Sequence, residues 1–335
     1  MNVRKATFAG SWYPDIAEGC KREITHFLKQ ADEVECPDGG WIGGIVPHAG
    51  WYFSGSIACK VIHSLKKGPS PDVFVVFGMH LHPKSSNYIM TEGAWETPLG
   101  NIEIETSLAR KLTDQFEFKI ETAKHHAKDN TIELQLPFIK YFFPHAKIVP
   151  IGVPPAETSI EIGKTAAKIS SELGFTAKVI GSTDLTHYGF NYGFIPEGMG
   201  PSAVEWVRSE NDRKVIDCML SLNPTGVIRE ALKHQNACCS GAVASAISKL
   251  FAPPRMPPGP CICWPGRTCS RLLPSLEMSA VTLAVAPPPK VTRVITAATP
   301  MTMPRMVRDD LKALRRISRW ARRMVSHNIG GPPES

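Results

Sequence analysis

Four short apolar runs recur along the amino-terminal part of the chain and predict the strands of a sheet. Two of them are rich in β-branched residues, and Gly, Pro or Asp stands beside most of their ends. Runs of this length and composition are typical of parallel strands that are buried on both faces. The four runs span Trp41–Pro47, Val73–Gly78, Lys147–Val153 and Ala177–Ser182.

The segments between these runs show the three- and four-residue apolar spacing of helices. A first helix is predicted at Asp15–Gln30, ahead of the first strand. Later helices are predicted at Gly55–Lys66, Ser107–Phe116, Thr131–Phe142 and Ser159–Leu173. The alternation predicts an α/β fold with a mostly parallel, doubly wound sheet flanked by helices. Residues Tyr88–Glu105 interrupt it, and Trp95–Asn101 indicates a hairpin beside the sheet.

Polar side chains follow three of the predicted strands at the point where each strand ends. They are His48 after the first run, His80 after the second, and Asp184 and His187 after the fourth. A Cys238-Cys239 pair lies further along the chain. The carboxyl ends of parallel strands meet at one edge of a sheet, where open α/β sheets bind ligands. Imidazoles, a carboxylate and a thiolate at one edge predict a metal site or a catalytic site.

Composition sets the class of protein. A chain of 335 residues with 43% hydrophobic content is long enough for one large α/β domain or two smaller ones. It has no uncharged apolar run of about 18 residues, and Met1-Asn2-Val3-Arg4-Lys5 lacks the apolar stretch of a signal peptide. We therefore expect a soluble, cytoplasmic protein with no membrane partner. Its nine cysteines are expected to be thiols rather than disulfides.

The positive charge lies in the carboxyl-terminal part of the chain. Residues 251–335 hold 13 Lys and Arg against 4 Asp and Glu, whereas residues 1–250 hold 25 against 27. The net charge of +7 therefore does not arise in the first 250 residues. Since nucleic-acid binders carry a basic surface, we expect no nucleic-acid partner for this part of the chain.

Five strings, in order along the chain, carry a family resemblance. They are Ala9–Pro14 (Ala-Gly-Ser-Trp-Tyr-Pro), Pro47–Trp51 (Pro-His-Ala-Gly-Trp), Gly78–His80, Glu133–Phe138 (Glu-Leu-Gln-Leu-Pro-Phe) and Ser182–Gly189 (Ser-Thr-Asp-Leu-Thr-His-Tyr-Gly). The set resembles the Memo family, also called AmmeMemoRadiSam system protein B. The resemblance runs from about Arg4 to Leu250. It implies a LigB-like fold, similar to that of class III extradiol dioxygenases, and association with radical-SAM and AMMECR-type proteins.

The resemblance also assigns residues to a site. It implies that His48, His80 and Cys239 face a metal, with Asp184 and His187 beside them as catalytic residues. Two imidazoles and one anionic ligand resemble the facial triad of non-haem iron oxygenases. Here the anion is a thiolate, which favours Cu(I) or zinc over iron. The resemblance to the facial triad points to iron and the thiolate points to copper or zinc, so all three metals stay open.

Several positions have a second interpretation. The two-residue spacing of His80 and His82 does not say which imidazole points inward. Cys238 competes with Cys239, which we favour because it stands three after Asn236 as in the family pattern. Asp184 and His187 would share a face of a helical turn, or Asp184 would cap that turn. Asn130 stands where the family often has a histidine, and neither His125 nor His126 is a safe substitute.

Residues 251–335 do not resemble the family. We expect residues 1–250 to form the α/β domain and residues 251–335 to be a disordered tail rich in Pro and Arg. Cys261, Cys263 and Cys269 lack the further ligands of a zinc knuckle. An amphipathic Arg-rich helix that binds a membrane surface or a partner is one interpretation, with Leu311, Leu314, Ile317, Trp320 and Met324 on its apolar side. We favour a frame change in the gene, because Ser275–Thr282 can be encoded by DNA that gives a family-like string in another frame.

Two classes of function follow from the sequence. The first is a metal-dependent redox enzyme that acts on a small molecule, such as a phenol, at the strand ends. The second is a binding protein that uses the same pocket to hold a peptide or another part of a partner, as the adaptor role of animal members of the family suggests. Metal content and dioxygen consumption separate the two.

Overall fold

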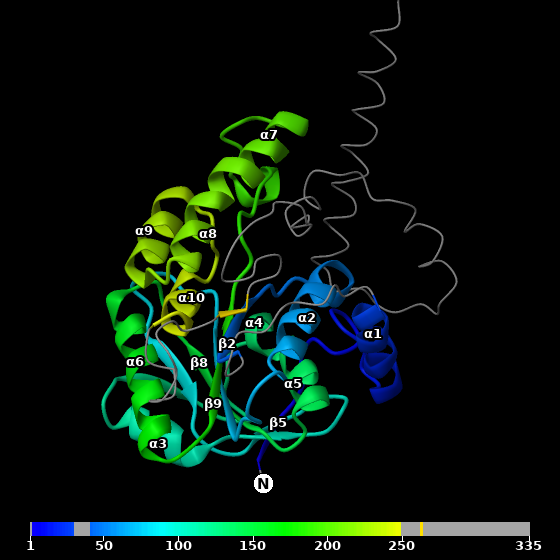
Figure 1. Cartoon of the computed structure of the whole chain (residues 1–335), viewed down its shortest axis with the longest axis vertical. Coiled ribbons are helices and arrows are strands. Elements are labelled where there is room, and N and C mark those ends of the chain that lie inside the picture. The colour runs from blue at the N-terminus through cyan, green and yellow to red at the C-terminus, as the bar shows by residue number, and fades with distance from the viewer. Residues whose placement is uncertain (1, 30–40, 249–261, 264–335) are drawn as a thin grey trace, which may run out of the picture. The chain divides into compact units, whose positions relative to one another are not determined.

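The computed structural model describes residues 2–29, 41–248 and 262–263, and these lie in one compact unit. Within them a seven-stranded sheet has the order β10-β2-β9-β3-β8-β4-β7. Figure 1 labels its strands β2, β8 and β9. Its strands are β2 (Gly43–Val46), β3 (Val73–Gly78), β4 (Asn87–Met90), β7 (Phe118–Glu121), β8 (Lys147–Gly152), β9 (Ala177–Ser182) and β10 (Ile262–Cys263). The mostly parallel α/β sheet that the sequence predicts is confirmed.

The four strands predicted from the apolar runs form the centre of the sheet. β3 pairs in parallel with β8 on one side and β9 on the other, and β9 pairs in parallel with β2. Alternate residues of β3 enter different cores: Val73, Val75 and Phe77 pack on one face, and Phe74 and Val76 on the other. Burial on both faces explains why these strands read as continuous apolar runs.

The irregular region between β3 and β8 contains strands that the apolar runs did not predict. β4 is antiparallel to β8 and parallel to β7. The predicted hairpin is confirmed, because β5 (Ala94–Trp95) pairs antiparallel with β6 (Ile102–Glu103). β5 also pairs with β1 (Val3–Arg4), so these three short strands form a separate small sheet.

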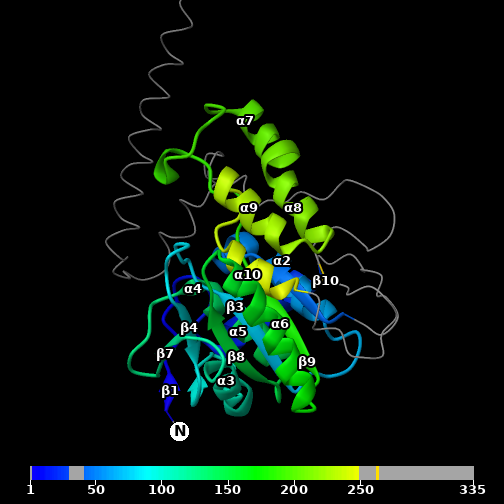
Figure 2. The ribbon, with the colours of Figure 1, turned by 90° about the vertical axis from the view of Figure 1, so that its left-hand side faces the viewer.

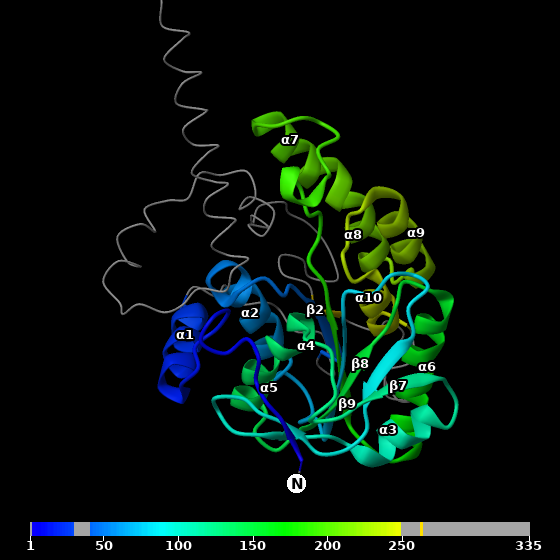
Figure 3. The ribbon, with the colours of Figure 1, turned by 180° about the vertical axis from the view of Figure 1, so that it is seen from behind.

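Helices cover both faces of the large sheet, as Figures 1 and 3 show from opposite sides. One face packs against α1 (Ala17–Lys29), α2 (Ser56–Ser64) and α5 (Leu136–Phe142). A π-helical turn, η1 (Trp51–Gly55), precedes α2. The helix predicted at Thr131–Phe142 is divided into α4 (Asn130–Glu133) and α5. Pro137 lacks an N–H, so it cannot donate the bond that would continue α4 into α5.

The opposite face packs against α3 (Thr106–Thr113), α6 (Glu157–Glu172) and α10 (Ser240–Ala246). After β9 the chain forms a helical subregion that the sequence analysis did not predict, seen near the labels α7 to α9 in Figure 2. Its elements are η2 (Phe190–Tyr192), α7 (Pro201–Trp206), η3 (Val207–Asn211), α8 (Asp212–Leu220) and α9 (Pro224–His234). α10 returns the chain to the sheet beside β9 and β3.

Only a small part of the predicted tail is described. Ile262–Cys263 forms β10, which pairs in parallel with β2 at one edge of the sheet. The rest of residues 251–335, including the predicted disorder, the amphipathic helix and the string Ser275–Thr282, lies outside the described residues. Among the residues that are described, no helix has both the length and the apolar character needed to cross a membrane.

Candidate metal centre

Four side chains with metal-binding atoms meet at the carboxyl end of the sheet. His48, His80, Cys238 and Cys239 place one ligand atom each within 4.8 Å of one another. His48 follows β2, His80 follows β3, and both cysteines stand just before α10. β2 and β3 flank β9 in the sheet, so the cluster lies over three adjacent strands.

His48 is held with one ring nitrogen turned toward the cluster. It is buried, and its Nδ1 lies 2.9 Å from Ser182 Oγ. The Ser182 hydroxyl donates to the carbonyl oxygen of Thr131 at 2.7 Å. Since that hydroxyl proton is already used, Ser182 Oγ accepts from His48, and Nδ1 carries the proton. The other nitrogen, Nε2, therefore faces Cys238 Sγ at 3.4 Å.

The charge on His48 is coupled to its neighbours. Burial alone would lower the pKa of His48, but the Asp184 carboxylate and the Cys238 thiol raise it to about 9. Burial would likewise raise the pKa of Cys238, but hydrogen bonding with Cys239 and attraction to His48 hold it well below its usual range. Burial and the neighbouring Cys238 raise the pKa of Cys239. In the metal-free protein Cys238 is therefore the more acidic of the two thiols.

His80 enters the cluster through an unusual backbone turn. Met79 has φ of 73°, a left-handed conformation that is uncommon for residues other than glycine. Its N–H donates to Thr131 Oγ1 at 2.7 Å, which holds the turn in place. His80 Nδ1 then lies 3.5 Å from Cys239 Sγ, whereas His82 is exposed and its Nδ1 accepts from the N–H of Lys84. The structure thus brings His80, not His82, into the cluster.

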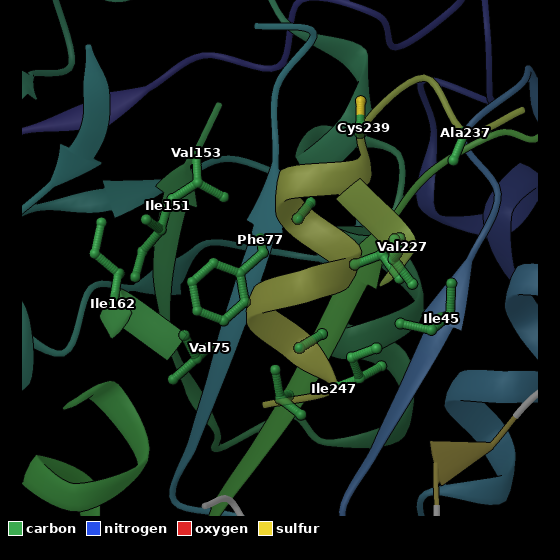
Figure 4. Close-up of a cluster of buried hydrophobic side chains, with 14 of the residues drawn as sticks. Ile45, Val75, Phe77, Ile151, Val153, Ile162, Val227, Ala237, Cys239 and Ile247 are labelled. Carbon is green, nitrogen blue, oxygen red and sulfur yellow. The ribbon is translucent and has the colours of Figure 1, made fainter. Parts of the chain in front are cut away.

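Cys239 stands at the amino end of α10, and its sulfur points away from the helix in Figure 4. A Cβ on Gly241 would collide with the carbonyl oxygen of Pro154, so the glycine lets α10 approach the end of β8. The glycine that follows the cysteines is therefore explained by helix packing, although it stands one position later than in the family pattern. The structure describes the side chains of Cys20, Cys59, Cys218, Cys238 and Cys239, and all five are free thiols.

Asp184 and His187 lie beside the cluster. Residues 183–188 are irregular, so the expected helical turn is absent from this segment and Asp184 does not cap it. Asp184 Oδ1 accepts from the His48 N–H at 2.8 Å, and Oδ2 lies 3.6 Å from His187 Nε2. The bond to Asp184 raises the pKa of His187 despite partial burial. His187 also stacks on Tyr192, with ring centroids 4.7 Å apart.

The family string at Glu133 has a structural role here. Glu133 is buried, and its Oε1 accepts from the N–H groups of Thr7 and Phe8 and from the Tyr13 hydroxyl. Asn130 donates to the His48 carbonyl oxygen at 2.9 Å, so it supports the His48 loop without offering an imidazole. His125 and His126 do not belong to the cluster.

A buried acid fixes the segment that carries Asp184 and His187. Asp212 accepts from both the N–H and the hydroxyl of Thr186, and burial raises its pKa to about 6. A raised carboxyl pKa means that the folded state binds more protons than the unfolded state between about pH 4 and pH 6. Stability is therefore lost as the pH rises through this window.

Asp212→Asn removes this titration and keeps an oxygen that accepts from Thr186. We compare the free energy of unfolding of this variant with that of wild type at two pH values. Relative to wild type, the variant is expected to be about 2 kcal/mol more stable at about pH 7.5 than at about pH 4.5. Urea unfolding at both pH values measures the difference. Asp217→Asn, on the exposed side of α8, is the control and is expected to track wild type. If the difference in free energy of unfolding between Asp212→Asn and wild type were the same at both pH values, the raised pKa of Asp212 would be contradicted.

Comparison with known proteins identifies the family. The family model described as Memo-like protein matches residues 4–252. The chain belongs to the Memo family. It is 34% identical to a MEMO1 family protein of Pyrococcus furiosus over 262 residues, covering 74% of this chain and 88% of that one. It is 37% identical to one of Pyrobaculum aerophilum over 262 residues, covering 75% and 88%.

The sequence analysis did not predict the residues that hold the side chains of this Memo-family protein's cluster and the segment beside it in place. Ser182 and Thr131 orient His48 and Met79, and Asp212 holds Thr186. Ser182 is the last residue of a predicted strand, so its burial was expected, but the partner of its hydroxyl depends on tertiary contacts. Cys238 was identified in the sequence but was ranked below Cys239, and the structure places both sulfurs in the cluster.

Proposed function

We propose that this Memo-family protein is a metal-dependent redox protein in which His48, His80 and Cys239 hold the metal. The observation that carries the proposal is the convergence of imidazole nitrogens and thiol sulfurs within 4.8 Å of one another. His48 supports it further, because ligating histidines usually donate their other ring N–H to an oxygen, as His48 does to Ser182.

The spacing of the donor atoms fits a metal ion. Metal–sulfur bonds of about 2.3 Å and metal–nitrogen bonds of about 2.0 Å at a tetrahedral angle separate nitrogen from sulfur by about 3.5 Å. The separation of Cys239 Sγ from His80 Nδ1 is 3.5 Å, and that of Cys238 Sγ from His48 Nε2 is 3.4 Å. Thiolate and imidazole ligands favour copper or zinc, and iron stays open. A bound copper or iron ion would supply one-electron chemistry.

Asp184 and His187 are suited to proton transfer next to such an ion. Attraction to His48 and a bond to His187 keep the pKa of Asp184 low although burial opposes this. The carboxylate then holds a proton on His187 Nε2, and about a third of the His187 side chain is exposed. Because the carboxylate stabilises the charged imidazolium, His187 is positioned to give its other ring proton, on Nδ1, to a small-molecule ligand such as a phenol. The stacked ring of Tyr192 restricts the rotation of the imidazole.

Ser182→Ala tests how His48 is oriented. Without the acceptor for Nδ1, the imidazole loses its fixed tautomer and direction, and metal affinity is expected to fall about 10- to 100-fold. Competition with a chromophoric chelator measures the change. Ser170→Ala removes another buried serine, on α6 and outside the cluster, and is expected to leave the affinity unchanged. Equal affinities for the two variants would contradict the role of Ser182.

A binding function for the same region is the second candidate. Exposed aromatic side chains stand on the turn that follows His48: Tyr52 is 74% exposed and Phe53 is 45% exposed. Trp12, also exposed, is tied to this turn because its carbonyl oxygen accepts from the Trp51 N–H. Exposed aromatic side chains are typical of surfaces that bind peptides or proteins. Radical-SAM and AMMECR-type proteins stay predicted partners.

Anaerobic purification of the full chain separates the two candidates. Elemental analysis gives the metal content, and an oxygen electrode measures dioxygen consumption with a panel of catechols. Stoichiometric metal with reversible oxidation and reduction, or with catechol-dependent dioxygen uptake, supports the redox function. A folded protein without metal that still binds a partner peptide would favour the binding function.

A further inference from the structure

The cluster contains a second sulfur, Cys238 Sγ, that the three-ligand set does not use. It lies 3.4 Å from His48 Nε2 and 3.8 Å from Cys239 Sγ. Cys239 Sγ in turn lies 3.5 Å from His80 Nδ1. The four donors therefore form a continuous chain, His48 to Cys238 to Cys239 to His80, in which each neighbouring pair is within 4 Å.

We propose that Cys238 is a fourth metal ligand, so that the centre binds a thiophilic ion, Cu(I) or Zn²⁺, through two sulfurs and two nitrogens. This inference rests on the proposed function, since it needs a metal at the site. Both thiols lose their protons to solvent when the ion binds.

The distances support this donor set. Two sulfurs about 2.3 Å from a tetrahedral ion are about 3.8 Å apart, and the two cysteine sulfurs are separated by 3.8 Å. The widest separation among the four atoms is within 4.8 Å, so about 1 Å of movement completes the tetrahedron. His80 is exposed and has room for such a movement, whereas His48 is buried and fixed.

The chain holds Cys238 Sγ in place with backbone contacts. The Asp184 N–H donates to Cys238 Sγ at 3.3 Å, and the Cys238 N–H donates to the Asp184 carbonyl oxygen at 3.1 Å. The Cys239 N–H donates to Thr183 Oγ1 at 3.1 Å. These bonds fix both cysteines against the segment that follows β9. An N–H bond to a sulfur also stabilises the thiolate that a metal requires.

A second thiolate changes what the centre binds. Soft sulfur ligands select Cu(I) and zinc, whereas open sites with one anionic ligand suit iron oxygenases. Four protein ligands also leave no vacant position on a tetrahedral ion. A small molecule would reach the metal only by displacing a ligand, and His80 and Cys238 are the two that are not buried.

X-ray absorption on the zinc-loaded and Cu(I)-loaded full chain counts the sulfur ligands. Wild type is expected to show two sulfurs, and Cys238→Ser and Cys239→Ser one each, with metal affinity at least about tenfold lower. Cys218→Ser, a half-buried cysteine on α8 outside the cluster, is the matched control and is expected to retain two sulfurs and full affinity. Metal is also expected to protect Cys238 from alkylation by iodoacetamide.

The outcomes separate the two proposals. A wild-type protein that binds metal through one sulfur, with unchanged affinity in Cys238→Ser, would overturn the fourth ligand and leave the proposed function standing. Wild type and Cys218→Ser that both bind no metal would overturn the proposed function and with it this inference. Alkylation of Cys238 at the same rate with and without bound metal would also contradict its role as a ligand.

Discussion

Replacing His48 and His80 together with alanine is expected to abolish stoichiometric metal binding by the full chain. The two imidazoles supply both nitrogens of the cluster, and the remaining sulfurs lie on adjacent residues of one short segment. Two ligands from one segment hold a metal far more weakly than four from three segments, because the ordering of the site is then lost. Elemental analysis after anaerobic purification and desalting measures the bound metal per chain.

Two comparisons keep this result interpretable. His82→Ala removes an exposed histidine two residues from His80 and is expected to retain the wild-type metal content. Metal-free wild type is the reference for folding, and the double variant is expected to show the same circular dichroism spectrum. Full metal content in the double variant would mean that the metal lies elsewhere in the protein.

Arg4→Ala is expected to reduce the free energy of unfolding by about 3 to 5 kcal/mol. Arg4 is buried, its Nη1 bonds Glu121 Oε2 at 2.6 Å, and its Nη2 donates to the Ala127 carbonyl oxygen at 2.9 Å. Its guanidinium also lies 3.5 Å from the centre of the Trp95 ring. Removing it leaves the buried Glu121 carboxylate without its cationic partner, which is the costly step.

Lys5→Ala is a matched control at the adjacent position. Lys5 forms an ion pair with Glu96 at 2.8 Å, but the Lys5 side chain is 75% exposed. An exposed pair of this kind contributes about 0 to 1 kcal/mol. Chemical denaturation of both variants measures the two costs. A loss below about 1 kcal/mol for Arg4→Ala would mean that the buried pair does not hold the amino-terminal strand to the fold.

The sequence predicted the centre of the sheet closely, because burial on both faces leaves a clear signal. The bounds of β3 and β9 agree with the apolar runs Val73–Gly78 and Ala177–Ser182. β7 gave no such run because two of its four residues are exposed and only Glu121 is buried. α7 to α9 were not predicted, although α8 places Val215, Ile216 and Met219 at helical spacing and buries all three.

The candidate site was predicted less completely than the fold. The position of His48, His80 and Asp184 at strand ends follows from the topology of a parallel sheet. The choice between His80 and His82 depends on the left-handed backbone at Met79, which no local pattern indicates for a methionine. The entry of both adjacent cysteines into the cluster depends on their bonds to the segment after β9, where the Asp184 N–H donates to Cys238 Sγ and Thr183 Oγ1 accepts from the Cys239 N–H. These bonds require the tertiary structure.

Anomalous diffraction from crystals of the metal-loaded full chain tests the central claim most directly. Data collected on both sides of the zinc or copper absorption edge locate the ion without reference to the protein. We expect one peak among His48 Nε2, His80 Nδ1 and the two cysteine sulfurs, at about 2.0 Å from nitrogen and about 2.3 Å from sulfur. A peak at any other position, or no peak after loading, would contradict this claim.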